Sequence, residues 1–383
     1  MAHVLPPPPP TEDAPPLDPN ISSNFLTLPN SHTMFYLAAG PLEGGLVVFV
    51  HGWPELSRSW RHQLSVLGNL GYRAIAPDMR GYGQSYIPHT KQEVEIEHNV
   101  NDLLALLNIL RGATSTAVFI GHDWGAPIVW TLAQCYPERV RGAGGVCIPA
   151  SPPKKPQAPI SVDVYRAKAD RHQWDYFVHH YDNTQASCEE LDADIPTTVT
   201  ACFQGSYSPP PPRMWNQYLS MFDQVQRFNA RTRTRGEAQV ELNSWFPATM
   251  SAVKHLIHRD SRVVDAQDVA CYAASIARNG GFEIPNFYYL NHQANDDFQR
   301  THTVNGGVLG MPTLMITAEY DAVCTPSISK HMDQLCLKLT RGHVFCGHWA
   351  QQERWREVNS IVVGWLFKIG CWPGKEAMLA SKI

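Results

Sequence analysis

The segment Gly121-His122-Asp123-Trp124-Gly125 places a carboxylate at a sharp turn of the chain. It follows the apolar run 117–120, which is typical of a buried strand, and precedes residues 126–136, which are typical of a helix. A residue bracketed by glycines between a strand and a helix is a nucleophile elbow. In most such turns that residue is serine, which attacks carbonyl carbons. An aspartate can instead displace a leaving group from a saturated carbon, and water must then cleave the resulting alkyl ester.

Alternating strands and helices are needed to hold this turn in place. Apolar runs predict strands, and the stretches between them carry helical spacing. This alternation indicates an α/β fold with a mostly parallel sheet that is covered by helices on both faces. The predicted strands are 46–50, 72–76, 117–120, 144–148, 313–316 and 339–345, and the predicted helices are 59–70, 93–111, 126–136, 327–337 and 355–367.

The alternation stops after Ile148 and resumes near residue 307. Residues 149–306 are rich in aromatic residues, histidine and proline, with helical stretches and no clear strand. We interpret them as an inserted, mainly helical cap on a core formed by 21–148 and 307–383. Residues 1–20 form a proline-rich arm to which we assign no catalytic role.

Two further residues complete a candidate catalytic triad with Asp123. In proteins with this elbow the acid follows a late strand and the histidine follows the last strand. Asp321 and His348 stand in those places. Glu319 is a nearby competitor that we rank lower, and a rival acid position, 149–160, contains no Asp or Glu. We therefore predict a nucleophile, an orienting acid and a general base, in that chain order.

A loop after the first apolar strand, His51-Gly52-Trp53-Pro54, is placed to stabilise an oxyanion. Such a loop supplies one backbone N–H, and the residue after the nucleophile supplies another. The predicted donors are the amides of Trp53 and Trp124. We interpret His51 as a structural histidine, and Pro54 as fixing the turn through a cis peptide bond.

Taken together, these segments resemble the epoxide hydrolases of the α/β-hydrolase fold, of the soluble and microsomal types, with the greatest similarity to the hydrolase domain of the soluble type. The similarity extends over most of the sheet domain and keeps the order and spacing of the motifs. It implies the fold, a cap, and a vicinal diol as product. The matching segments are 51–63, 78–85, 121–130, 136–140, 315–321 and 346–349.

The resemblance also implies two cap tyrosines that hold the epoxide oxygen and donate a proton. Tyr176, within Trp174-Asp175-Tyr176, matches the first. Tyr289, soon after the segment 281–285, matches the second, and Tyr288 is the adjacent alternative. The cap segment 206–251 is longer than is usual in the family.

The expected reaction is hydrolysis of a small-molecule epoxide through an ester on Asp123, with no organic cofactor and no metal. Haloalkane dehalogenases share the triad, but they often carry Asn or Glu where this chain has Trp53. A non-catalytic ligand-binding protein on the same scaffold is a further alternative. It would usually lack a triad residue, and none is missing here.

Composition limits the partners. The net charge of −4 argues against nucleic acid, and no apolar run reaches the length of a membrane span. Nine cysteines without close pairing indicate reduced thiols, and hence a cytoplasmic protein. The C-terminal Ser381-Lys382-Ile383 is similar to a peroxisomal address, which makes the peroxisome the alternative location. We expect a monomer or a homodimer.

Overall fold

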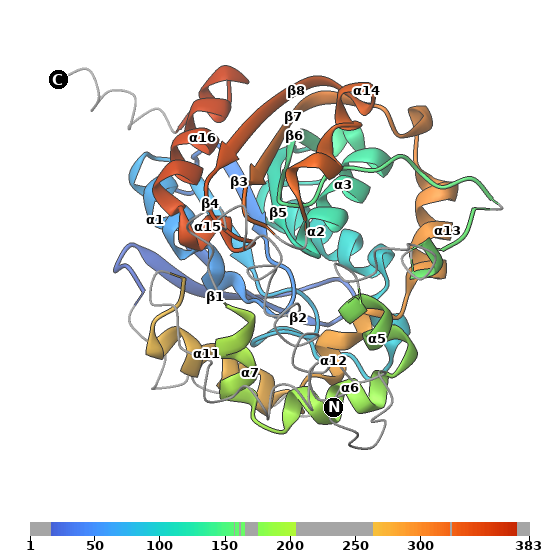
Figure 1. The fold of residues 1–383 in the computed structure, drawn as a ribbon. Helices are drawn as coiled ribbons and strands as arrows, with labels where there is room; N and C mark the ends of the chain where they lie inside the picture. The colour runs from blue at the N-terminus through green and yellow to red at the C-terminus, as the bar shows by residue number, and fades with distance from the viewer. Residues whose placement is uncertain are drawn as a thin grey trace, which may run out of the picture.

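The computed structural model describes residues 17–156, 158–160, 162–164, 175–203, 263–321 and 324–373. Most of the proline-rich arm, the long cap segment 206–251 and the C-terminal Ser381-Lys382-Ile383 lie outside these residues. Within them, one eight-stranded sheet forms the centre of the molecule (Figure 1). No helix of the described part is long and apolar enough to cross a membrane.

The sheet is mostly parallel, as predicted. Its order is β1-β2-β4-β3-β5-β6-β7-β8, and only β1 and β2 pair antiparallel with their neighbours. The strands are β1 (Ile21–Thr27), β2 (Thr33–Ala39), β3 (Leu46–Val50), β4 (Arg73–Pro77), β5 (Ala117–His122), β6 (Val140–Val146), β7 (Leu309–Ala318) and β8 (Cys336–Val344). β1 and β2, which were not predicted, extend the sheet beyond its first parallel strand.

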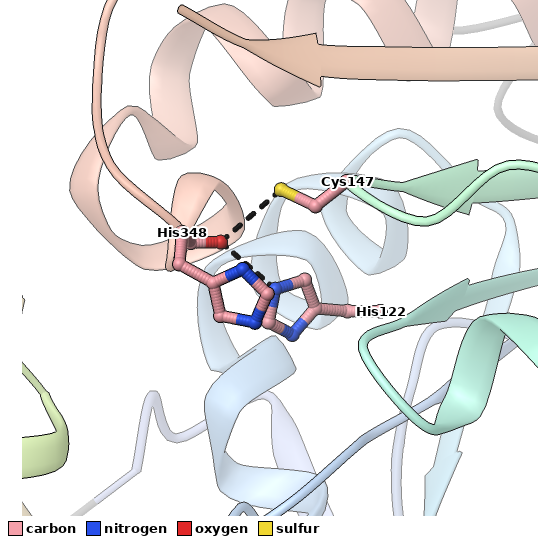
Figure 2. Close-up of side chains that lie close together, drawn as sticks. All are labelled: His122, Cys147 and His348. Carbon is pink, nitrogen blue, oxygen red and sulfur yellow. Dashed lines mark hydrogen bonds between the residues drawn. The ribbon is translucent and has the colours of Figure 1, made fainter. Parts of the chain in front are cut away.

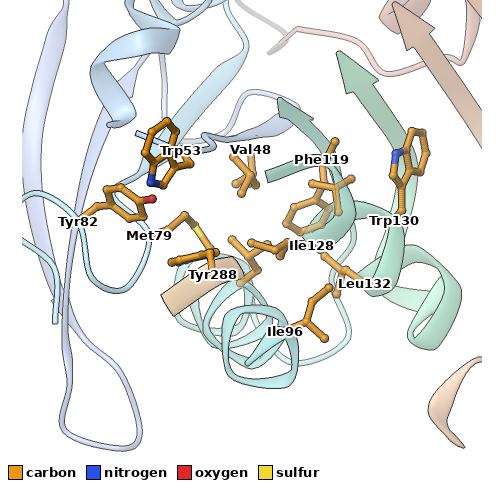
Figure 3. Close-up of a cluster of buried hydrophobic side chains, with 14 of the residues drawn as sticks. Val48, Trp53, Met79, Tyr82, Ile96, Phe119, Ile128, Trp130, Leu132 and Tyr288 are labelled. Carbon is orange, nitrogen blue, oxygen red and sulfur yellow. The ribbon is translucent and has the colours of Figure 1, made fainter. Parts of the chain in front are cut away.

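Helices cover both faces of the sheet because its central strands are apolar on both sides. On β3, Val47 and Phe49 pack with the helices α1 (Arg61–Asn69) and α16 (Trp355–Lys368). Val48 and Val50 face the opposite way, toward α2 (Ile96–Arg111) and α3 (Gly125–Cys135). Figure 3 shows part of this second core, in which Val48 and Phe119 of the sheet lie near Ile128 and Leu132 of α3. The shorter core helices are η1 (Ser57–Trp60), η2 (Lys91–Val94), η3 (Pro137–Arg139), η8 (Pro326–Ser329), α14 (Met332–Leu335) and α15 (Ala350–Glu353).

All regular elements described between β6 and β7 are helical. They are α5 (Asp175–Asp182), α6 (Thr184–Asp192), α7 (Ile195–Cys202), α11 (Ala266–Arg278), α12 (Glu283–Asn286), η6 (Phe287–Tyr289), α13 (His292–His302) and η7 (Asn305–Gly307). In Figure 1, α5, α6, α7, α11 and α12 form a layer at the bottom of the view, with the sheet domain above them.

Polar contacts fasten this layer to the sheet domain. Asp268 of α11 accepts from Arg58 at 2.7 Å and from Arg61 at 2.9 Å, and the Trp349 indole donates to the carbonyl of Cys202 at 2.8 Å. The arginines are largely buried with their partner. Breaking a buried ion pair is costly because it leaves an uncompensated charge, so these contacts hold α11 and the end of α7 against the sheet domain.

Candidate active site

Asp123 follows β5 directly, in a left-handed backbone conformation with φ of 48°. A non-glycine residue is strained in that conformation, and such strain is typical of a nucleophile elbow. The flanking glycines are required sterically. A Cβ on Gly121 would lie 2.3 Å from the carbonyl oxygen of Gly125, and one on Gly125 would lie 2.2 Å from that of Val50. The sequence therefore folds here into a turn that presents one carboxylate.

The predicted triad residues meet at this turn. His348 Nε2 lies 3.5 Å from Asp123 Oδ2, and His348 Nδ1 lies 2.8 Å from Asp321 Oδ2. The other oxygens of the two carboxylates are held by backbone amides. Trp53 N donates to Asp123 Oδ1 at 2.7 Å, and Cys324 N donates to Asp321 Oδ1 at 2.8 Å. Three loops thus bring a nucleophile, a base and an acid into one line.

Burial and charge act in opposite directions on these groups. Burial disfavours ionisation of Asp123, but the hydrogen bond and charge of His348 outweigh it and hold the pKa of the carboxyl below its ordinary value. The pKa of Asp321 is lowered in the same way, against burial, chiefly by His348. Burial would lower the pKa of His348, yet the two carboxylates raise it well above its ordinary value. The resting site therefore holds an imidazolium between two carboxylates.

A second buried pair, Glu55 and His122, lies behind the triad. His122 Nδ1 is 2.7 Å from Glu55 Oε2, and both side chains are fully buried. Glu55 also accepts from the amide of Gly52 at 2.8 Å and from Gln351 Nε2 at 2.7 Å. His122 Nε2 is 2.9 Å from the carbonyl oxygen of His348. The pair therefore links the oxyanion loop, the elbow strand and the loop of the base.

Cys147 contacts the same carbonyl from the end of β6. Its Sγ donates to His348 O at 3.2 Å, beside the bond from His122, as Figure 2 shows. The nearby thiol also contributes to the lowered pKa of the Asp321 carboxyl. Cys147 has a φ of 68°, so its backbone is strained like that of Asp123. The loop of the base is thus held from two sides.

Tyr289 lies over the elbow, between the two predicted oxyanion tryptophans. Its ring centroid is 5.8 Å from that of Trp53 and 5.2 Å from that of Trp124, both edge-on. The ring of Tyr176 is also a neighbour of Tyr289, at 6.0 Å, slightly farther than that of Phe177 at 5.2 Å. Burial first, then the nearby Tyr176 and Asp123, raise the pKa of Tyr289 well above its ordinary value. The phenol is therefore protonated in the resting site.

Tyr288 faces away from this cluster. Its hydroxyl is hydrogen-bonded to the carbonyl oxygen of Arg80 at 2.9 Å and to Asn99 Oδ1 at 3.0 Å. In Figure 3 it lies beside Met79 and Tyr82, within the hydrophobic core. Of the two adjacent tyrosines, Tyr289 is the one beside the elbow.

A cavity of about 400 Å³ opens onto the nucleophile. Asp123, Trp124 and Tyr176 line it together with Phe177 and Cys324. Its remaining walls contain both apolar and polar residues, and they include Ile96, Pro127, Trp130, Gln134, Ile148, Lys154, His292, Asp296 and His331. The volume suits a small organic molecule.

The two remaining sequence-predicted residues are placed as follows. Trp124 is the N-cap residue of α3, in the same turn as the nucleophile. His51 donates from Nδ1 to the carbonyl of Gly52 and accepts at Nε2 from the amide of Met79, both at 2.9 Å. Both of its ring nitrogens are engaged, so it is structural, as expected. The Trp53–Pro54 peptide bond is cis, as predicted.

The comparison with protein families agrees with this geometry. A family model described as alpha/beta hydrolase fold matches residues 45–354. The chain belongs to the alpha/beta hydrolase fold family. This family accounts for the sheet order, the elbow after β5 and the positions of the acid and the histidine after β7 and β8.

Relatives of the chain within the alpha/beta hydrolase fold family bear epoxide hydrolase names. Bifunctional epoxide hydrolase 2 of Sus scrofa is 32% identical over 324 residues, covering 84% of this chain and 51% of the pig protein. Epoxide hydrolase B of Mycobacterium tuberculosis is 27% identical over 352 residues, covering 85% of this chain and 92% of the relative. The chain spans about half the length of the bifunctional relatives that it matches.

A solved structure is similar over nearly its whole length. The crystal structure of epoxide hydrolase A from Mycobacterium thermoresistibile superposes with a TM-score of 0.72 at 27% identity. The match covers 90% of this chain and 98% of the other. The chain therefore shares its fold with a solved protein of that name.

Sequence reasoning missed three residues of this alpha/beta hydrolase site. Glu55, His122 and Cys147 carry no motif that predicts their contacts, since each partner is distant in sequence. The one available signal for Glu55 was a charged residue within the loop that holds the Trp53 amide. For His122 it was a histidine at the end of an apolar strand.

Proposed function

We propose that this chain hydrolyses epoxides to vicinal diols through an alkyl ester on Asp123. The observation that carries the proposal is the orientation of that carboxylate. Oδ1 accepts from the Trp53 amide while Oδ2 faces His348, and the side chain lines the same cavity as Tyr176. The epoxide hydrolase names of the similar proteins support the same reaction.

In the first step, Oδ2 of Asp123 attacks one carbon of the epoxide ring and the C–O bond of that carbon breaks. The electron pair goes to the ring oxygen, and we expect Tyr176 and Tyr289 to hold that oxygen. One tyrosine hydrogen-bonds this oxygen and the other donates its proton, because an alkoxide is far more basic than a phenolate. Proton donation of this kind contributes about 10²–10⁴-fold in rate.

Ester formation then changes the protonation of the base. The carboxylate of Asp123 loses its charge, so one of the two groups that raise the pKa of His348 is removed. The imidazolium gives its proton back to the tyrosinate through solvent. His348 is then neutral and is oriented by Asp321, as a general base requires.

In the second step, His348 takes a proton from water, and the hydroxide attacks the carbonyl carbon of the ester. The amides of Trp53 and Trp124 stabilise the oxyanion, each being worth about 10²–10³-fold. The tetrahedral intermediate expels the diol oxygen, which takes the carboxyl proton. Asp123 is a carboxylate again and His348 an imidazolium, so the cycle closes with one water consumed.

The contact of the Trp53 indole favours an epoxide over a haloalkane. A dehalogenase needs N–H donors directed at the departing halide. Here the Trp53 indole donates to Asn286 Oδ1 at 3.2 Å, so this donor is already engaged. The nearby phenols are proton donors, which an alkoxide needs and a halide does not.

The test is a single turnover in heavy-oxygen water with enzyme in excess over an aryl or alkyl epoxide. Ester chemistry puts an unlabelled Asp123 oxygen into the first diol, whereas direct attack by water labels that diol at once. The His348→Gln variant should accumulate the ester, visible as a mass increase equal to the substrate on the peptide that contains Asp123. His343→Gln is the matched control, because His343 is partly exposed on the edge strand β8 and contacts Glu319 and Thr317. A label in the first diol, or no mass increase in His348→Gln, contradicts the proposal.

A further inference from the structure

Cys324 adds a thiol to the triad without a role in the reaction above. The three residues Asp321, Cys324 and His348 each offer one ligand atom, and these atoms all lie within 4.8 Å of one another. The set combines a carboxylate oxygen, a sulfur and an imidazole nitrogen. These are the ligand types that Zn²⁺ and related soft divalent cations prefer. Asp321 and Cys324 are three positions apart in the sequence, whereas His348 follows 24 positions after Cys324.

The thiol of Cys324 is buried but is accessible from the cavity. Cys324 is 1% exposed, yet it lines the same cavity as Asp123 and Tyr176. The His348 side chain is 14% exposed. A hydrated cation that enters the cavity therefore reaches the sulfur from the substrate side, next to the partly exposed ring of His348.

We propose that Asp321, Cys324 and His348 form an inhibitory site for a thiophilic divalent cation such as Zn²⁺ or Cd²⁺. The cation takes the place of the proton that now lies between His348 Nδ1 and Asp321 Oδ2, 2.8 Å apart. Separations within 4.8 Å need only small side-chain movements to reach metal–ligand distances of about 2.0–2.3 Å. A solvent molecule from the cavity completes a tetrahedral set.

Binding of the cation releases two protons. The thiol of Cys324 and Nδ1–H of His348 each lose one proton to solvent, and each gains one bond to the cation. Asp321 exchanges a hydrogen bond for a metal–oxygen bond. No electrons are transferred, and no other reactant is needed.

The expected effect of the bound cation on catalysis rests on the proposed function and concerns the hydrolysis of the ester. A metal-bound imidazole is a weak base, so His348 can no longer activate water. The carboxylate of Asp123 is not a ligand and remains able to attack. The cation should therefore permit one alkylation per enzyme and stop the hydrolysis of the ester.

Binding is tested without any substrate. Purified full-length protein is titrated with CdCl₂ in thiol-free buffer, and the ultraviolet cadmium–thiolate absorbance is compared between wild type, Cys324→Ser and Cys271→Ser. Serine keeps the size and the backbone amide of Cys324 but is a poor ligand for a soft cation. Cys271 is a partly buried thiol on α11 of the cap and serves as the matched control.

We expect a saturable absorbance in wild type and in Cys271→Ser, and at least about 10-fold weaker binding in Cys324→Ser. An unchanged Cd²⁺ titration in Cys324→Ser overturns the proposal. Each variant's rate of diol formation with CdCl₂ or ZnCl₂ is then divided by its own metal-free rate. The inhibition should be relieved in Cys324→Ser alone, and inhibited wild type should carry the ester on Asp123. Metal-free wild-type protein that forms no diol refutes the proposed function instead, and leaves the binding result standing.

Discussion

Gly52→Ala should separate catalysis from stability at the oxyanion loop. A Cβ at this position would lie 2.4 Å from Asp123 Cβ and 2.5 Å from Asp123 Oδ1. Ordinary contact begins at 3.4 Å, so the nucleophile and the loop must move apart by about 1 Å. The hydrogen bond from Trp53 N to Oδ1, now 2.7 Å, would then exceed the length at which it counts as a bond.

Loss of one oxyanion donor predicts a fall in kcat of about 10²–10³-fold, or about 2.7–4 kcal/mol. The same overlap in a packed site should cost about 1–3 kcal/mol of folding free energy. Diol formation at saturating substrate measures the first quantity, and urea unfolding measures the second. The deficit should appear mainly in ester hydrolysis, where the oxyanion forms.

Gly364→Ala is the matched control. Gly364 lies exposed in α16, and a Cβ there meets no atom within 4 Å. Its replacement should leave kcat unchanged and stabilise the protein by about 0.5–1 kcal/mol, since glycine weakens a helix interior. If Gly52→Ala folded normally and kept the wild-type kcat, the inferred role of the Trp53 amide would be wrong.

Three further perturbations have defined outcomes. Tyr289→Phe should slow ester formation by about 10²–10⁴-fold in stopped-flow single turnovers. Tyr288→Phe breaks two buried hydrogen bonds, so it should lower the free energy of unfolding by about 1–3 kcal/mol and leave the rate of ester formation unchanged. If Tyr288→Phe slowed ester formation and Tyr289→Phe did not, Tyr288 would be the proton donor. Glu55→Ala leaves His122 buried without its partner and should destabilise the fold by about 3–5 kcal/mol in urea unfolding, whereas a loss below about 1 kcal/mol would mean that the pair is dispensable. The pKa of His348 is raised in the folded state. Its contribution to stability is therefore complete below a pH of about 6.5 and is lost as the pH rises through the folded-state pKa. The difference in unfolding free energy between wild type and His348→Gln should accordingly shrink toward alkaline pH.

The parallel core and the triad positions were predictable because their signals are local. An apolar run followed by a glycine-bracketed turn identifies β5 and Asp123 from a few consecutive residues. β1 gave no such signal, since its residues alternate between half-buried and exposed and include Ser22 and Asn24. The predicted helix 327–337 is two short helices, η8 and α14. His331, in the gap between them, hydrogen-bonds through Nε2 to the carbonyl oxygen of Ala150, which no local pattern indicates.

The supporting contacts of the site were not predictable, because they join residues distant in the chain. Glu55 and His122 are 67 positions apart, and Cys147 reaches His348 across 201. Neither residue of the first pair stands in a pattern that requires a charge. Their pairing depends on how β3, β5 and the loop after β8 lie together, which is a property of the assembled sheet.

Because both ring nitrogens of His122 are hydrogen-bonded, they affect which group can take a proton from solvent in the site. This imidazole adjoins the nucleophile in the chain, and its ring centroid is 4.7 Å from that of His348. A free nitrogen there would offer an approaching solvent molecule a competing proton acceptor on the wrong side of the intermediate. Since Glu55 engages one nitrogen and a carbonyl oxygen the other, His122 has no lone pair to spare, and it does not compete with His348 in directing solvent.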